Sequence, residues 1–130
     1  MIKFGYTILY VQDVTASITF YETAFGFERR FIAPDGTYAE LVTGSTTLSF
    51  AAHNLAKTNL PNAYTESSLQ QKAFGIEIGF TTQEVESTVN SALAAGAKLE
   101  APAKTKPWGQ TVAYVRDLDG FLIEICTPMQ

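Results

Sequence analysis

Aromatic and β-branched residues alternate along residues 6–11, a pattern typical of a β-strand. After Asp13, apolar residues recur every three to four positions. This spacing predicts an amphipathic helix that starts at Val14 and is closed by Gly26. Three short strands separated by turn residues are predicted next, at residues 28–32, 37–42 and 46–51.

The same order of elements begins again in the second half of the chain. Residues 53–72 are rich in Asn, Thr, Ser and Ala and show no clean periodicity, which indicates a linker. Beyond it the pattern predicts a strand, a helix and three further strands, at residues 75–80, 83–95, 98–101, 110–115 and 121–126.

This internal repeat predicts two βαβββ modules, at residues 1–52 and 73–130, within a single α+β domain. One alignment of the halves sets Tyr6 on Gly75, and a second sets Leu48 on Glu124. A single module would leave one face of its sheet unburied. The modules must therefore pair, either within the chain or between chains.

Composition narrows the partners that this chain could have. A length of 130 residues with 46% hydrophobic and 17% charged residues is typical of one globular domain, and a net charge of −4 argues against nucleic acid. No apolar run is long enough to span a membrane, and no cleavable leader is evident. With Cys126 as the single cysteine, we expect a cytoplasmic protein whose partner is a small molecule.

Two motifs carry a resemblance to a known family. The first motif comprises residues 10–14, Phe20-Tyr21 and residues 25–27, and the second is the closing motif at residues 117–124. Together they resemble the vicinal oxygen chelate superfamily. That group includes glyoxalase I, extradiol dioxygenases, fosfomycin-modifying enzymes and bleomycin-resistance proteins. The resemblance implies two modules whose curled, mixed sheets form a cup, commonly in a homodimer.

In metal-dependent members the resemblance also implies four protein ligands, two from each module. They would fall here on Tyr6, Leu48, Gly75 and Glu124. Only Glu124 binds a hard divalent cation well, because a neutral phenol is a poor ligand and the other two side chains offer no donor. A one-residue slip would substitute Thr47 or Ser49 for Leu48, neither a usual ligand. We therefore expect no metal and no other cofactor.

Glu124 is the residue that could still carry chemistry, as a general acid or base. Period-two alternation places Glu77 on the same side of its strand as Gly75, facing the same cavity, and so near Glu124. Two neighbouring carboxylates would raise one pKa and attract a cation. The alternative is a structural ion pair between Glu124 and an arginine, with the candidates Arg29, Arg30 and Arg116.

Aromatic residues form the second group of candidates for ligand binding. Alternation predicts that Tyr6, Tyr10 and Phe50 face inward, and Trp108 lies beside a glycine at the entry to a strand. In bleomycin-resistance-like members a tryptophan–glycine pair at a similar place lines the ligand groove. An aromatic-lined cleft with few polar groups suits a flat molecule. The alternative is that these rings are simply core.

Together these observations favour a metal-free binding protein of the bleomycin-resistance type that sequesters an aromatic or cationic compound, as in antibiotic resistance. The first alternative is a metal-independent isomerase or lyase that uses Glu124. A lyase or dioxygenase with an unusual metal-ligand set is the second.

Overall fold

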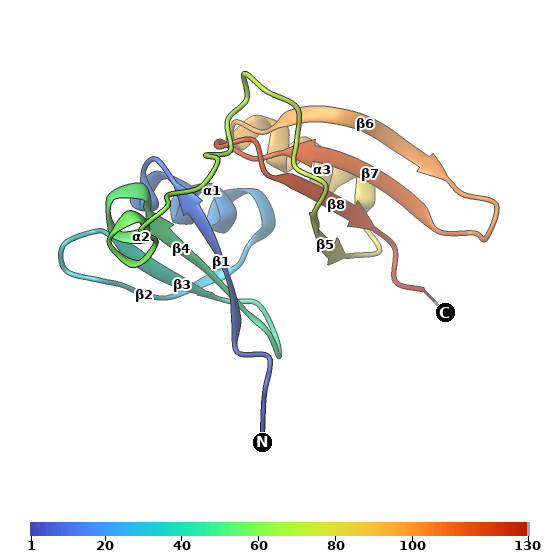
Figure 1. The fold of residues 1–130 in the computed structure, drawn as a ribbon. Coiled ribbons are helices and arrows are strands. Elements are labelled where there is room, and N and C mark those ends of the chain that lie inside the picture. Colours follow the sequence, from blue (N-terminus) through green and yellow to red (C-terminus); the bar gives the residue numbers. More distant parts are fainter. Residues whose placement is uncertain (130) are drawn as a thin grey trace. The chain divides into compact units, whose positions relative to one another are not determined.

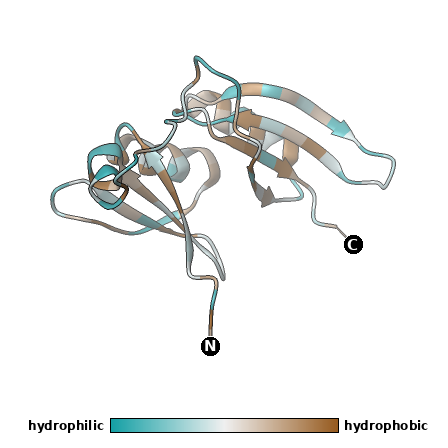
Figure 2. Ribbon diagram, viewed as in Figure 1, coloured by the Kyte–Doolittle hydropathy of each residue, from teal (hydrophilic) through white to brown (hydrophobic). Residues whose placement is uncertain are grey.

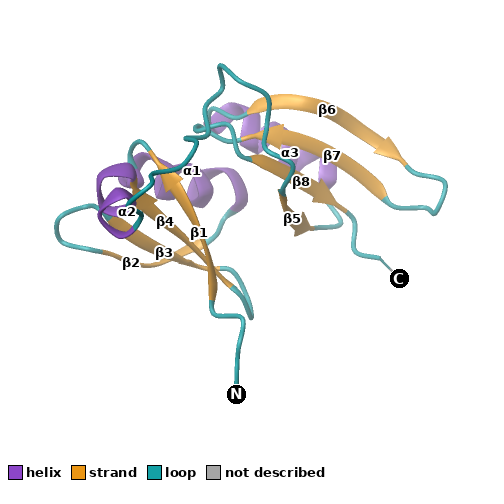
Figure 3. Cartoon of the chain, in the orientation of Figure 1, coloured by secondary structure: helices purple, strands orange, loops and turns teal. Residues whose placement is uncertain are grey.

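The computed structural model describes residues 1–129, and the chain divides into two compact units, Met1–Glu66 and Ser67–Gln130 (Figure 1). In each unit a 4-stranded sheet is packed against one long helix (Figure 3). Among the described residues, no helix has the length and apolar character needed to cross a membrane.

The first unit has the strand order β1-β4-β3-β2. Strands β1 and β4 are parallel, whereas the other neighbouring strands are antiparallel. The elements are β1 (Tyr6–Val11), α1 (Val14–Phe25), β2 (Glu28–Ile32), β3 (Tyr38–Val42), β4 (Thr47–Ala52) and α2 (His53–Asn59).

Helix α1 is defined at both ends and covers one face of this sheet. The Asp13 carboxylate caps it by accepting a hydrogen bond from the Ala16 amide at 3.0 Å, and Gly26 ends it in the left-handed region at φ 75°. The buried Tyr21 ring lies 5.0 Å from that of Phe50 on β4. Phe50 and Leu48 therefore face α1. Ser49 faces the opposite side, which we call the open face of the first unit.

The second unit repeats this arrangement with the strand order β5-β8-β7-β6, in which β5 is parallel to β8. Its elements are β5 (Glu77–Thr81), α3 (Val85–Ala95), β6 (Lys98–Thr105), β7 (Thr111–Arg116) and β8 (Leu122–Cys126). The hydrophobic residues of both sheets appear as brown segments along the strands in Figure 2.

Helix α3 packs on β6, β7 and β8, where Val115, Ile123 and Ile125 are fully buried. The residues that alternate with these, among them Tyr114 and Glu124, point to the other side of the sheet. We call that side the open face of the second unit.

The closing motif is a tight turn between β7 and β8. The Asp117 carboxylate accepts hydrogen bonds from the amides of Asp119 (3.0 Å) and Phe121 (2.8 Å). Gly120 has a φ of 88°, and a Cβ there would lie 2.7 Å from the Ser68 carbonyl oxygen. Only glycine fits this position without strain.

The α+β class and the two βαβββ repeats predicted from the sequence are confirmed. Two elements differ from the prediction. Helix α2 occupies the start of the predicted linker; it has no side-chain cap and buries only Ala56, so its sequence pattern is weak. Strand β6 continues to Thr105, beyond the predicted end at residue 101. Its full length was not predicted because bulges on either side of Ala101 interrupt the alternation of the sequence.

Candidate functional site

The second unit gathers a small polar cluster on its open face, centred on Glu124. This residue lies on β8 between the buried Ile123 and Ile125, so its side chain must point away from α3. The Tyr114 hydroxyl, directly opposite on β7, donates a hydrogen bond to Oε2 at 3.0 Å. The Cys126 thiol donates to Oε1 at 3.2 Å. Both carboxylate oxygens are thereby held in place.

Glu77 joins this cluster from β5, the edge strand that runs parallel to β8. Burial raises the pKa of Glu77 above its usual range, and the charge of Glu124 and a hydrogen bond to it raise that pKa further. The two carboxyl groups therefore interact with each other on the open face. The structure places these carboxyl groups side by side, as the strand alternation predicts.

Gly79 leaves the space beside Glu124 free. It is the β5 partner of Glu124, and a Cβ there would lie 3.5 Å from Oε1. A glycine inside a strand often marks a place where another group approaches the backbone closely. Glu124 itself is half-buried.

The two donors to Glu124 are weak acids in this environment. Burial, followed by the hydrogen bond to Glu124, raises the pKa of Tyr114 to about 12. The same causes raise the pKa of the Cys126 thiol to about 11. Cys126 therefore acts as a neutral hydrogen-bond donor and is a poor nucleophile.

None of the three candidate arginines pairs with Glu124 within residues 1–129, which contradicts the alternative of a structural ion pair. Arg29 pairs with Glu22 at 2.9 Å, and Arg30 pairs with Glu40 at 3.3 Å. Arg116 is buried and donates instead to the backbone carbonyls of Gly120 (3.0 Å), Ser68 (3.1 Å) and Gln71 (2.9 Å).

Trp108 lies in the turn between β6 and β7 and is 64% exposed. Its indole N–H donates to Gln110 Oε1 at 2.9 Å. Sequence reasoning did not identify Gln110. The period-two alternation of Gln110 with Tyr114 was the available signal.

The aromatic candidates of the first unit do not share one environment. Tyr6 is 57% exposed on the open face, and Tyr10 on the same face packs against Tyr64 with ring centroids 4.8 Å apart. The predicted inward orientation of Phe50 is wrong, because it pairs with Leu9 and not with Tyr10, and so faces α1.

The repeat also has a different register from the one predicted. Val85 begins α3 as Val14 begins α1, so Glu77, not Gly75, corresponds to Tyr6. The strand pairings then place Glu124 in correspondence with Ser49. Leu48 faces α1, and Gly75 precedes β5. Alternation set Glu77 on the side of Glu124, but it left undetermined the shift along the strand and, on β4, which set of residues faces α1.

The first unit holds a polar cluster of its own, which the sequence reading missed. Glu40 on β3 accepts from the Tyr38 hydroxyl at 2.7 Å and from Arg30 at 3.3 Å. Arg30 also donates to the Thr47 hydroxyl at 3.1 Å. The adjacent Ser49 hydroxyl is fully buried and lies near Tyr38, but outside hydrogen-bonding geometry. In this cluster the carboxylate is matched by a cation.

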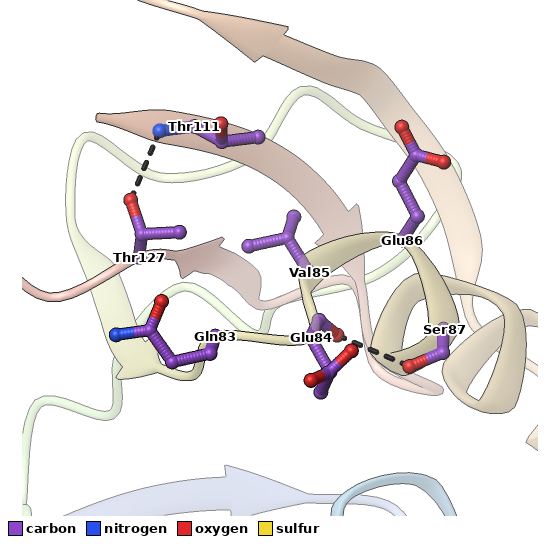
Figure 4. Close-up of a pocket in the computed structure, with 7 residues that line it drawn as sticks. All are labelled: Gln83, Glu84, Val85, Glu86, Ser87, Thr111 and Thr127. Carbon is purple, nitrogen blue, oxygen red and sulfur yellow. Dashed lines mark hydrogen bonds between the residues drawn. The ribbon is translucent and has the colours of Figure 1, made fainter. Parts of the chain in front are cut away.

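Two hollows lie elsewhere in the second unit. One of about 220 Å³ lies where β5 leads into α3; its lining includes Glu84, Glu86 and Thr111, whose amide donates to the Thr127 hydroxyl at 3.0 Å (Figure 4). Another of about 290 Å³ lies between α3 and β6 and is lined mainly by apolar side chains such as Leu93 and Leu99. Neither contains a residue of the Glu124 cluster.

The family model of the Glyoxalase/Bleomycin resistance protein/Dioxygenase superfamily matches residues 3–125. The chain belongs to this superfamily. A glyoxalase-related enzyme from Fulvimarina pelagi has a similar fold, with a TM-score of 0.85 and 22% identity over 98% of this chain and 89% of the other. A superfamily enzyme from Burkholderia phytofirmans PsJN has a TM-score of 0.81 and 24% identity, over 98% of this chain and 100% of the other.

TioX from Micromonospora sp. ML1 is a further structural neighbour of this superfamily chain, with a TM-score of 0.72 and 22% identity over 98% of this chain and 99% of the other. At these identities the similarity establishes the fold alone. A search of curated proteins gives no significant match.

Many members of the glyoxalase superfamily use a divalent metal, so the donor set of this chain matters. In the described part of the chain, no group of three or more His, Cys, Asp or Glu side chains could share one ion. Glu77 and Glu124 contribute two carboxyl groups, and the imidazole of His53 is engaged elsewhere, with Nδ1 2.6 Å from the Tyr64 hydroxyl. These residues do not fit a tightly held divalent ion.

Proposed function

We propose that this chain binds a small organic cation with a planar ring at the open face of its second unit, without a metal. Sequestration of the compound is the function. In this proposal Glu124 and Glu77 supply the negative charge and Trp108 supplies a stacking surface. A metal ion is not required, because the ligand itself provides the positive charge.

The observation that carries the proposal is the unmatched carboxylate pair. Within residues 1–129 no ion pair involves Glu77 or Glu124, whereas the carboxylate on the open face of the first unit has Arg30. Placing two acids side by side costs free energy unless a cation arrives, which a ligand would supply. The net charge of −4 also favours cationic over anionic ligands.

Trp108 supports the aromatic part of the proposal. A large indole that is 64% exposed in a hairpin turn contributes little to the core. Tryptophan is the best aromatic partner for a cation, and a planar ligand would also stack on it.

Isothermal titration calorimetry with matched probes tests the proposal. N-methylacridinium is a permanent planar cation, and acridine at pH 8 is its neutral counterpart. We expect the cation to bind at least tenfold more tightly, and Glu124→Gln to remove most of that preference. Glu84→Gln, an exposed glutamate of the same unit outside the cluster, is the control. Equal binding of the two probes would contradict the proposal.

A second candidate is acid–base catalysis without a metal. Glu77, whose pKa is raised by burial and by Glu124, would serve as the acid, and the adjacent Glu124 would serve as the base. The deciding result would be turnover that Glu124→Gln abolishes while ligand binding survives. Under sequestration the same variant loses binding and no product forms.

We also propose a homodimer, as is common in this superfamily, and a role in resistance to a cationic aromatic compound. Sedimentation equilibrium checks the first. Expression of the chain in a sensitive bacterium challenged with acriflavine checks the second, with Glu124→Gln expected to remove protection.

A further inference from the structure

Trp108 is held by a specific hydrogen bond although most of its ring is exposed. Its indole N–H donates to Gln110 Oε1 at 2.9 Å. An exposed aromatic side chain gains conformational entropy when it is free to rotate. A bond that opposes this freedom is informative, because the core does not need the ring in one place.

Gln110 is itself fixed from the other end of its amide. Its Nε2 donates to the Thr127 carbonyl at 2.9 Å, immediately after β8. One end of the amide therefore accepts and the other donates. A glutamine meets both needs, whereas glutamate meets only the acceptor role and alanine meets neither.

The backbone around Trp108 is equally constrained. The Lys106 amide donates to the Gln110 carbonyl at 2.8 Å, and the Gly109 amide donates to the Lys106 carbonyl at 2.9 Å. Gly109 has a φ of 94°, which lets the turn close directly after Trp108. The backbone of the turn and the ring are thus both held at Gln110.

Gln110 also connects Trp108 to the acidic pair. Gln110 directly precedes β7, and the alternation of that strand, continued by one residue, puts it on the side of Val112 and Tyr114. Its side chain lies close enough to the Cys126 thiol to oppose the increase in the pKa of that thiol, which burial and Glu124 cause. Cys126 in turn donates to Glu124.

We propose that Gln110 is a positioning residue that holds the Trp108 ring as a fixed stacking surface at the margin of the Glu77–Glu124 site. It thereby selects planar aromatic cations over cations that have no ring. The ligand part rests on the proposed function, whereas the fixing of the ring does not. If Gln110 only strengthened the hairpin, its loss would not change this selectivity.

The ring-holding part can be measured without a ligand, because Trp108 is the only tryptophan. Time-resolved fluorescence anisotropy would compare the wild type with Gln110→Ala and Gln110→Glu. We expect a fast local motion of the indole to appear in Gln110→Ala and to stay absent in Gln110→Glu, which keeps the acceptor. Gln83→Ala, outside the Gln110–Trp108 contact, is the control for folding.

The selectivity part uses N-methylacridinium and tetramethylammonium as probes in calorimetry. Gln110→Ala should weaken the binding of N-methylacridinium three- to tenfold and leave the binding of tetramethylammonium unchanged. Gln110→Glu should restore the wild-type ratio of the two dissociation constants. Unchanged anisotropy in Gln110→Ala, or an equal loss for both cations, would overturn the proposal. If neither cation binds to any variant, the proposed function fails and the selectivity part fails with it. The anisotropy result still decides whether Gln110 holds the ring.

Discussion

The open faces of the two units carry related side chains with opposite outcomes. Each has a glutamate that accepts a hydrogen bond from a tyrosine hydroxyl: Glu40 from Tyr38 at 2.7 Å and Glu124 from Tyr114 at 3.0 Å. In the first unit Arg30 neutralises the glutamate, whereas in the second the additional neighbour is another acid, Glu77. The same scaffold thus builds a closed polar pair once and an unmatched one once. The unmatched pair is the candidate for function.

The largest expected effect contrasts the turns before the last strand of each unit. Gly120 and Gly44 both have positive φ, but only at Gly120 would a Cβ meet the backbone, 2.7 Å from the Ser68 carbonyl oxygen. Gly120→Ala should lower the free energy of unfolding by about 3 kcal/mol and Gly44→Ala by about 1 kcal/mol. Urea denaturation measures both, and equal losses would mean that the Ser68 contact has no weight.

The next effect breaks the charge comparison directly. Glu124→Gln should weaken the binding of N-methylacridinium by at least about 1.4 kcal/mol, a factor of ten in Kd, because the ligand loses a carboxylate partner. Glu40→Gln should leave binding unchanged and lower stability by under about 1 kcal/mol, since the side chain of its partner Arg30 is 43% exposed. Calorimetry of both variants is the measurement. A larger binding loss in Glu40→Gln would move the site to the first unit.

A smaller effect concerns alkaline pH and Cys126, for which the first unit has Ala51 at the corresponding position. Burial and Glu124 raise the pKa of the thiol from 9.0 to about 11, so the folded chain holds this proton more tightly than the unfolded chain. The raised pKa stabilises the folded chain by about 1–2 kcal/mol. This contribution is fully present below pH 9 and is lost as the pH rises to about 11.

Cys126→Ala, which copies Ala51, should flatten that part of the pH dependence. Thermal unfolding of both proteins between pH 8 and 11 would show it. Tyr114, whose pKa is raised to about 12, would keep a residual slope at the upper end. Parallel curves for the wild type and Cys126→Ala would refute the role of the thiol.

The smallest effect concerns the gap beside Glu124. Gly79 in the second unit corresponds to Ile8 in the first, where the neighbouring Ser49 is fully buried. Gly79→Ala would place a methyl group 3.5 Å from Glu124 Oε1, an ordinary contact. We expect a two- to threefold weaker Kd for N-methylacridinium, with stability changed by under about 1 kcal/mol. Tighter binding would show that the gap is not an approach route.

Much of the fold could be predicted because its signals are local. Asp13 and Gly26 delimit α1 by capping, and the turn at residues 117–120 is specified by its own side-chain hydrogen bonds and glycine. The full length of β6 was not predicted because bulges break its alternation, and α2 was not predicted because it buries only Ala56. Local sequence patterns do not show the stabilising contacts that a bulged strand or a weak helix makes with neighbouring elements.

The site was predictable only in part, for a related reason. Alternation correctly set Glu77 on the side of Glu124, since a side chain's face depends on parity alone. The correspondence of Glu77 with Tyr6 and of Ser49 with Glu124 required the strand register, which parity leaves open. The arginine partners and the Trp108–Gln110 contact depend on side-chain reach across the sheet, which no spacing along the chain specifies.

The most direct test of the unmatched carboxylate pair is a carbon-13 NMR titration of the glutamate side-chain carboxyl groups with and without N-methylacridinium. We predict that the signals of Glu77 and Glu124 shift on addition of the cation, that the titration midpoint of Glu77 falls, and that the Glu40 signal stays in place. Movement of the Glu40 signal alone, or no change in any of the three, would contradict the assignment of the site to the second unit.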